Sequence, residues 1–146
     1  MGSRTARAIG VVAVIGLLLA QLIPIDRRNP PVEAEVHASP DVRVLLRRAC
    51  YDCHSNETVW PWYARVAPVS WLLVYDVESG RDGVNFSTWT AYGPGRREKL
   101  LRESADEIAE GEMPPWYYRL AHPDARLTSD EVAILCAWAT GERAAR

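Results

Sequence analysis

The sequence has little lysine, little net charge and no repeats. All but one of the 17 basic residues are arginines, and the formal net charge of the 146 residues is −2 because acidic residues are interleaved with the arginines. No basic stripe forms, so we expect no nucleic-acid partner. Proline and glycine follow no period and no longer block recurs, which argues against collagen-like, solenoid and propeller architectures.

One long hydrophobic run is present, at the N-terminus. Arg4 and Arg7 precede residues 8–25, in which one glutamine is the only clearly polar side chain. This length is near the lower limit for spanning a bilayer, so residues 1–25 are predicted to be a signal anchor. A cut after Ala20 would put leucine where a signal peptidase needs a small residue. We therefore favour a retained transmembrane helix, with a cleaved signal peptide as the alternative.

Residues 26–40 are rich in proline and carry charges, which predicts an extended spacer that holds the next domain just off the membrane. Residues 41–146 then form the folded domain. About 100 residues give a small core, and domains of that size commonly gain stability from a covalent or metal-linked group.

Helical periodicity runs through this domain and alternating strand patterns are absent, so we expect an all-α fold. Residues 42–49 place apolar side chains at i, i+3, i+4 and i+7, with Ser39 and Pro40 as the helix start. A second helix is predicted over residues 69–79, ended by Gly80. Its run WLLVY predicts heavy burial.

Two further helices are predicted in the C-terminal half. One covers about residues 96–110, with Gly111 placed to close it. The other opens with Thr128 and Glu131, spaced as a capping box, and continues as VAILCAWA. This last helix is apolar on most sides, so we expect it to be packed inside, with Cys136 as an inert buried thiol.

The chemistry is concentrated in the run Cys50-Tyr51-Asp52-Cys53-His54. Two cysteines three positions apart with a histidine after the second have the spacing of c-type haem attachment. The thiols add to the vinyl groups, and the histidine reaches the iron. We therefore expect one covalently attached haem c held by Cys50, Cys53 and His54. Since this attachment takes place outside the cytoplasm, the haem domain is expected on the periplasmic side of the cytoplasmic membrane.

Two other uses of the cysteine pair stay open. One is a disulfide or thioredoxin-like pair, although no βαβ pattern surrounds it. The other is a zinc site that adds Cys136, His37 or His122 to the cysteines and His54, although a second paired-ligand motif is missing.

The sixth iron ligand is predicted to be Met113, the one methionine besides Met1. It follows the Gly111 helix stop and precedes two prolines, so its thioether lies on a stiff loop. Met/His ligation is usual in electron-transferring cytochromes c. His122 is the alternative sixth ligand.

Many aromatic residues occur near the same motifs, and we expect them to wrap the porphyrin and fill the core. They are Trp60, Trp62, Tyr63, Trp71, Trp116, Tyr117 and Tyr118. A Trp or Tyr could also bind a haem propionate, with Arg65 as its charge partner.

The runs CYDCHSNETVWPWYARVAPVSWLL, GRDGVNFSTW and EIAEGEMPPWYYRLAHPDARLTSDE resemble the bacterial haem-binding domain family, which has a single Cys-x-x-Cys-His and is similar to small cytochromes c. The segment QLIPIDRRNPP is also similar to that family. The resemblance implies haem attachment at Cys50, Cys53 and His54. It does not settle function, because members are known mainly as haem-binding domains.

Two classes of function follow. The first is a membrane-tethered electron carrier with a redox protein partner, and we expect this carrier rather than a catalyst. The second is a haem-based sensor or peroxidase-like module with an open or switchable sixth iron position. A structural role for the haem is a weaker third possibility.

Overall fold

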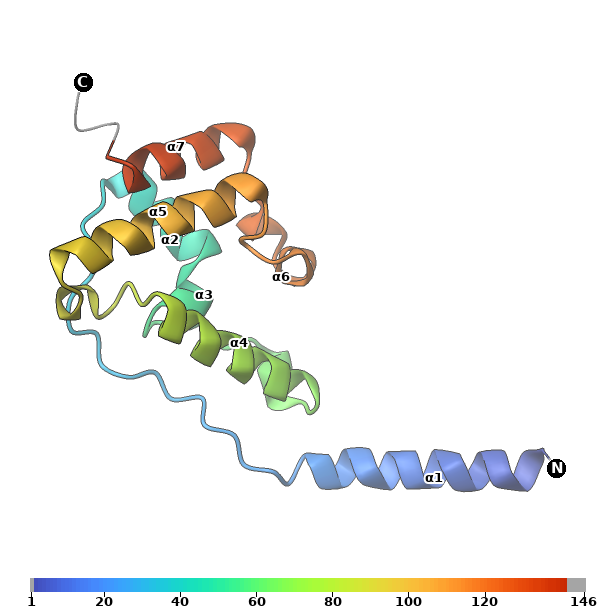
Figure 1. Cartoon of the computed structure of the whole chain (residues 1–146). Coiled ribbons are helices and arrows are strands. Elements are labelled where there is room, and N and C mark those ends of the chain that lie inside the picture. The colour runs from blue at the N-terminus through green and yellow to red at the C-terminus, as the bar shows by residue number, and fades with distance from the viewer. Residues whose placement is uncertain (1, 142–146) are drawn as a thin grey trace.

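A computed structural model describes residues 2–141 and shows an all-helical protein (Figure 1). Among these residues no strand is present beyond one isolated bridge between Ala34 and Thr88. The last five residues of the predicted domain, 142–146, lie outside the described residues. The α-helices are α1 (Ser3–Ala20), α2 (Pro40–Ala49), α3 (Tyr51–His54), α4 (Val69–Gly83), α5 (Pro94–Glu110), α6 (Trp116–Ala121) and α7 (Ser129–Ala139). Three 3₁₀ turns are η1 (Trp62–Arg65), η2 (Trp89–Ala91) and η3 (Pro123–Ala125).

Helix α1 extends away from the other helices, and none of its side chains is buried (Figure 1). Its 18 residues are long and apolar enough to cross a membrane. The helix ends at Ala20, earlier than the end of the hydrophobic run at residue 25. Pro24 cannot continue a helix, and the Gln21 side chain turns to bond Ala67. The first residues after α1 are thus attached to the folded domain.

The proline-rich segment is extended, as expected, but it does not stand off as a spacer. Residues 22–38, which we call the strap, run along the domain. The amides of Glu33 and Ala34 donate to the Ser87 carbonyl at 2.9 and 3.0 Å, and the amide of Val36 donates to Phe86 at 3.0 Å. Val36 is 4% exposed and belongs to the hydrophobic core. The segment is therefore hydrogen-bonded to the domain, which composition alone does not reveal because the partners lie about fifty residues away.

The core forms where α2, α5 and α7 meet. The predicted stripe of α2 is buried, and α5 packs against α7 (Figure 1). On α7, Leu135 is fully buried and Ala139 nearly so. Its other apolar residues are half-buried or exposed, so the helix covers the core from one side rather than passing through it. The Cys136 thiol is half-buried and donates to the Ala105 carbonyl. Arg48 of α2 bonds Glu131 of α7 at 2.6 Å.

Helix ends were predicted well where the signal is local. Gly111 adopts a left-handed conformation, with φ 78°, and ends α5. Thr128 and Glu131 form the predicted capping box of α7.

Helix α4 differs from prediction in two ways. It continues through Gly80 to Gly83. Its apolar run is also far from buried, since Trp71, Leu72 and Tyr75 are 40%, 50% and 67% exposed. The helix packs on α3 and η1 with the face that carries Ser70, Val77 and Gly80, which leaves the aromatic face open.

Candidate haem site

The cysteine–histidine motif forms the single turn α3, which directly follows α2. Cys50 interrupts the helix, and Tyr51 then anchors the turn in the core, since it is 3% exposed and stacks on Phe86 with ring centroids 5.8 Å apart. The local periodicity of α2 therefore positions the motif at the edge of the core.

The His54 imidazole is held by one ring nitrogen. Nδ1 lies 2.9 Å from the Gly80 carbonyl and 3.2 Å from the Val84 carbonyl, so it carries the proton and donates. Burial lowers the pKa of His54 below its ordinary value, which keeps the ring neutral. Among the hydrogen bonds of residues 2–141, none involves Nε2. A neutral imidazole oriented by backbone carbonyls through Nδ1 is the usual form of a metal-binding histidine.

Gly80 allows α4 to approach α3. A Cβ added to Gly80 would lie 2.6 Å from the Cys53 carbonyl oxygen, well inside van der Waals contact. This residue was expected to stop the helix. It lies inside the helix instead, because the two backbones touch there. The same approach brings the Gly80 carbonyl to His54.

The two thiols of the motif are free, and both cysteines are half-buried. Burial raises the pKa of Cys50 and of Cys53 to about 12, so both are protonated. A redox-active cysteine pair of the thioredoxin type needs a lowered thiol pKa, and here burial raises it. In the part of the chain that the structure describes, no three His, Cys, Asp or Glu side chains are grouped to hold a metal ion. The zinc and thioredoxin-like interpretations thus gain no support from the arrangement.

A cavity of about 420 Å³ lies against the motif. Cys50, Cys53 and His54 line it, together with the loop of Met113, Pro114 and Pro115. Apolar side chains of α2, α5 and α7 form much of the remaining wall. Four carboxylates also line it, from Asp52, Asp76, Glu103 and Glu107. The cavity therefore gathers all four predicted haem-binding residues.

The Met113 loop reaches the cavity because α5 ends in a tight reversal. The amides of Glu112 and Met113 donate back to the Glu107 carbonyl at 3.0 and 3.2 Å, around the left-handed Gly111. This is the Schellman type of helix end. Met113 is 37% exposed, so its side chain is accessible at the cavity wall.

His122, the alternative sixth ligand, does not line the cavity. Its Nε2 is bonded to the Tyr63 hydroxyl at 2.7 Å, and its ring stacks on Tyr118 with centroids 4.2 Å apart. The nitrogen that would ligate iron is already engaged, so the arrangement favours Met113.

A bond that sequence reasoning missed joins the motif to α6. The Tyr118 hydroxyl donates to Oδ2 of Asp52 at 2.8 Å, while Oδ1 accepts the Val59 amide at 2.9 Å. Burial raises the pKa of Tyr118, so the phenol stays a donor. Asp52 and Tyr118 are 66 residues apart, and no local pattern links them.

The aromatic residues divide differently from the expectation. Of those near the motifs, Tyr117 and Tyr118 line the cavity, together with Trp138 of α7. Trp62 and Trp116 are 78% and 66% exposed. Arg65 does not line this cavity either, so it is not placed to pair with a propionate there.

The residues of the cavity fit a haem. Its walls are largely apolar, two thiols lie next to a histidine whose Nε2 is free of hydrogen bonds, and a thioether comes from another element. A porphyrin needs this combination, an apolar enclosure with iron ligands.

Comparison with known proteins also supports haem binding. A family model described as "Haem-binding domain" matches residues 15–141. No curated protein and no solved structure matches the chain at the significance threshold.

Proposed function

Because the chain belongs to the haem-binding domain family, we propose that it holds one covalently attached haem c and carries electrons at a membrane. The observation that supports this most is the shared cavity of Cys50, Cys53, His54 and Met113. A bound haem would supply reversible one-electron chemistry at its iron.

Each of these residues has a distinct task. Cys50 and Cys53 hold the cofactor by thioether bonds, and His54 offers Nε2 to iron while Nδ1 donates to backbone carbonyls. Those second bonds fix the ring orientation and raise its basicity. Met113 offers a thioether, which favours ferrous iron. The apolar wall excludes water, and a low-dielectric surrounding would favour ferrous iron, the less charged oxidation state.

An electron carrier is favoured over a sensor or peroxidase-like module by the polar groups near the cavity. A module of the second kind is expected to present a histidine or an arginine to a small molecule at the open iron position. His122 is bonded to Tyr63 and lies outside the lining, and no arginine is among the lining residues. The sensor or peroxidase-like module stays as the alternative function.

Helix α1 is the proposed single-pass anchor, with the haem domain on the periplasmic side of the cytoplasmic membrane. Its apolar length supports the anchor, and the haem c chemistry supports the periplasmic side. A redox protein is the proposed partner.

Covalent attachment is tested on the full chain, exported in a host that matures c-type cytochromes. We expect the haem to resist acid–acetone extraction and to give a c-type pyridine haemochrome. Replacing Cys50 and Cys53 together by Ala should abolish both results, while Cys136→Ala, outside the cavity, should change neither. Haem that is extracted from the unmodified chain contradicts covalent attachment.

Met113 ligation is tested by redox titration and carbon monoxide binding. Met113→Ala should lower the reduction potential, remove the near-infrared sulfur-to-iron band and let the reduced protein bind carbon monoxide readily. Leu120→Ala is the matched control, because Leu120 is 63% exposed on the adjoining α6. If the unmodified protein already binds carbon monoxide as readily as the variant, the alternative function is favoured.

A further inference from the structure

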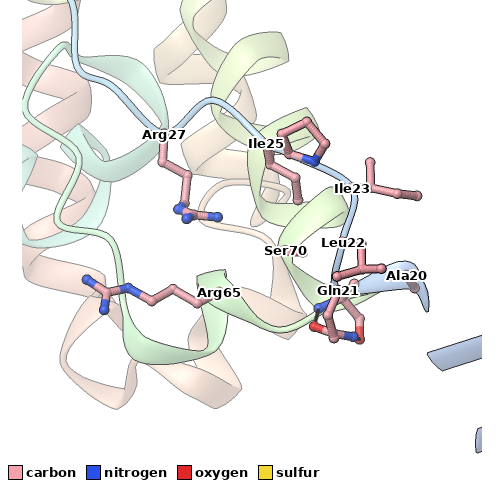
Figure 2. Close-up of a pocket in the computed structure, with 10 residues that line it drawn as sticks. Ala20, Gln21, Leu22, Ile23, Ile25, Arg27, Arg65 and Ser70 are labelled. Atoms are coloured by element: carbon pink, nitrogen blue, oxygen red, sulfur yellow. Dashed lines mark hydrogen bonds between the residues drawn. The ribbon is translucent and has the colours of Figure 1, made fainter. Parts of the chain in front are cut away.

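A second pocket, of about 330 Å³, lies where α1 ends (Figure 2). It is formed by residues 20–27 on one side and by the segment from Arg65 to Ser70 on the other. Gln21 joins the two sides. Its Oε1 accepts the Ala67 amide at 3.0 Å, and its Nε2 donates to the Ala67 carbonyl at 3.1 Å. These two hydrogen bonds hold the walls of the pocket together at the point where the chain leaves the proposed membrane helix.

Two arginines without carboxylate partners line this pocket. The ion pairs of the described residues include neither Arg27 nor Arg65, and the nearby Asp26 is already paired with Arg28 at 2.7 Å. Arg27 extends from the strap into the gap, whereas the exposed Arg65 side chain points away from Ser70 and Gln21 (Figure 2). Nη1 of Arg27 donates to the Ala64 carbonyl at 3.3 Å, which leaves its other N–H groups for an anion. The exposed Arg65 side chain has to turn toward the pocket to reach the same anion.

Ser70 supplies a polar group in the pocket wall. It is 1% exposed, and its hydroxyl has no hydrogen-bond partner in the part of the chain that the structure describes. An unsatisfied buried hydroxyl costs free energy unless a ligand pairs with it. Ser70 lies in the first turn of the 15-residue helix α4, where the helix dipole also favours negative charge.

Large apolar and aromatic side chains are exposed on the elements that contribute to the pocket, namely η1, α4 and the start of the strap. Trp62 and Tyr75 are 78% and 67% exposed, and Leu22, next to the end of α1, is 76% exposed. Tryptophan and tyrosine are enriched where proteins meet lipid headgroups, because their rings are apolar with one polar atom.

We infer that this pocket binds the phosphate of an anionic phospholipid headgroup. The inference rests on the proposed anchoring by α1. The phosphate oxygens accept hydrogen bonds from the Arg27 guanidinium and the Ser70 hydroxyl, and from Arg65 once its exposed side chain turns toward the pocket. The headgroup thereby holds the haem domain against the bilayer, with the aromatic residues at headgroup depth.

The test uses the full chain in detergent, with lipid binding measured by native mass spectrometry. Phosphatidylglycerol is titrated against phosphatidylcholine, and inorganic phosphate is added as competitor. We expect the unmodified chain to retain phosphatidylglycerol selectively. Its affinity for this lipid should fall about fivefold for each arginine replaced, in Arg27→Gln, in Arg65→Gln and in the double variant. The control Arg43→Gln/Arg102→Gln removes two exposed arginines on α2 and α5 and should bind like the unmodified chain.

Ser70→Ala separates a ligand role from a structural one. Because the hydroxyl has no partner in the protein, its removal should weaken phosphatidylglycerol binding without lowering the denaturation midpoint. Equal retention of both lipids, unchanged binding by the arginine variants, or displacement by inorganic phosphate at lipid-equivalent concentration would overturn the headgroup assignment. Release of the unmodified chain from membranes by carbonate would instead refute the proposed anchoring by α1. If the unmodified chain stays in the membranes but the arginine variants bind phosphatidylglycerol as well as it does, only the pocket assignment is refuted.

Discussion

The contact between Gly80 and Cys53 gives a sharp prediction, since alanine at position 80 should separate α4 from α3. The added Cβ would lie 2.6 Å from the Cys53 carbonyl oxygen, 3.0 Å from its carbonyl carbon and 3.1 Å from its Cβ. Ordinary contact begins at 3.4 Å, so the helices must move apart by about 0.8 Å. None of the three atoms is the end of a flexible side chain, so the backbone itself has to move.

The magnitude follows from a matched pair. Gly83 lies on the same helix and, like Gly80, lines the haem cavity, but a Cβ there meets no protein atom within 4 Å. Gly83→Ala should therefore leave stability unchanged or raise it by up to ~1 kcal/mol, the gain in helix propensity. Gly80→Ala has a similar gain but also the cost of overpacking. We expect it to be ~2 kcal/mol less stable than Gly83→Ala, within the usual range of ~1–3 kcal/mol.

The assay is guanidinium unfolding of the haem-loaded full chain in detergent, followed by circular dichroism and haem absorption. Gly80→Ala should also shift the reduction potential, because the Gly80 carbonyl that orients His54 moves with the helix. If both variants have equal unfolding midpoints and equal potentials, the close approach of the two helices is refuted.

Three further predictions concern other parts of the molecule. A chain of residues 39–146 should be at least ~3 kcal/mol less stable than one of residues 26–146, because it loses buried Val36 and its neighbouring backbone bonds, and equal unfolding midpoints would contradict this. Tyr118→Phe should lower stability by ~1–2 kcal/mol with haem retained, because its bond to a carboxylate is lost. Val44→Ala, at an exposed position of α2, is the control and should stay within ~0.5 kcal/mol of the unmodified chain. In a haem-free chain with both motif cysteines changed to Ser, the free energy of unfolding should fall as pH drops below 6.5. Burial holds the folded pKa of His54 lower, so the unfolded chain binds the proton first, and a flat profile between pH 8 and 5 would contradict this.

The sequence predicted the features that depend on neighbouring residues. The buried stripe of α2, the capping box of α7 and the left-handed Gly111 each follow from spacing within one or two turns. The motif could be identified for the same reason, because the chemistry of haem attachment requires a short fixed spacing. Met113 was predicted as a ligand on other grounds, since it is the one methionine besides Met1 and follows a helix stop.

Features that depend on distant residues were missed. The apolar run of α4 predicted burial, yet hydrophobicity alone cannot tell a core from an exposed aromatic face. The role of Gly80 depends on the Cys53 backbone, and the strap depends on Ser87 and Phe86. Each of these partners lies too far along the chain for periodicity to reveal it.

The strap also decides how far the haem domain can travel from α1. A free linker of fifteen residues would have a root-mean-square end-to-end distance of about 20 Å, so the domain could move over that range relative to α1. Here the backbone is held at intervals from Gln21 to Val36, so that freedom is lost. If α1 spans a bilayer, the haem cavity is kept at one height and in one orientation above it. The proposed redox partner would then have to bring its own electron-exchanging group to that height, since the domain cannot swing out to meet it.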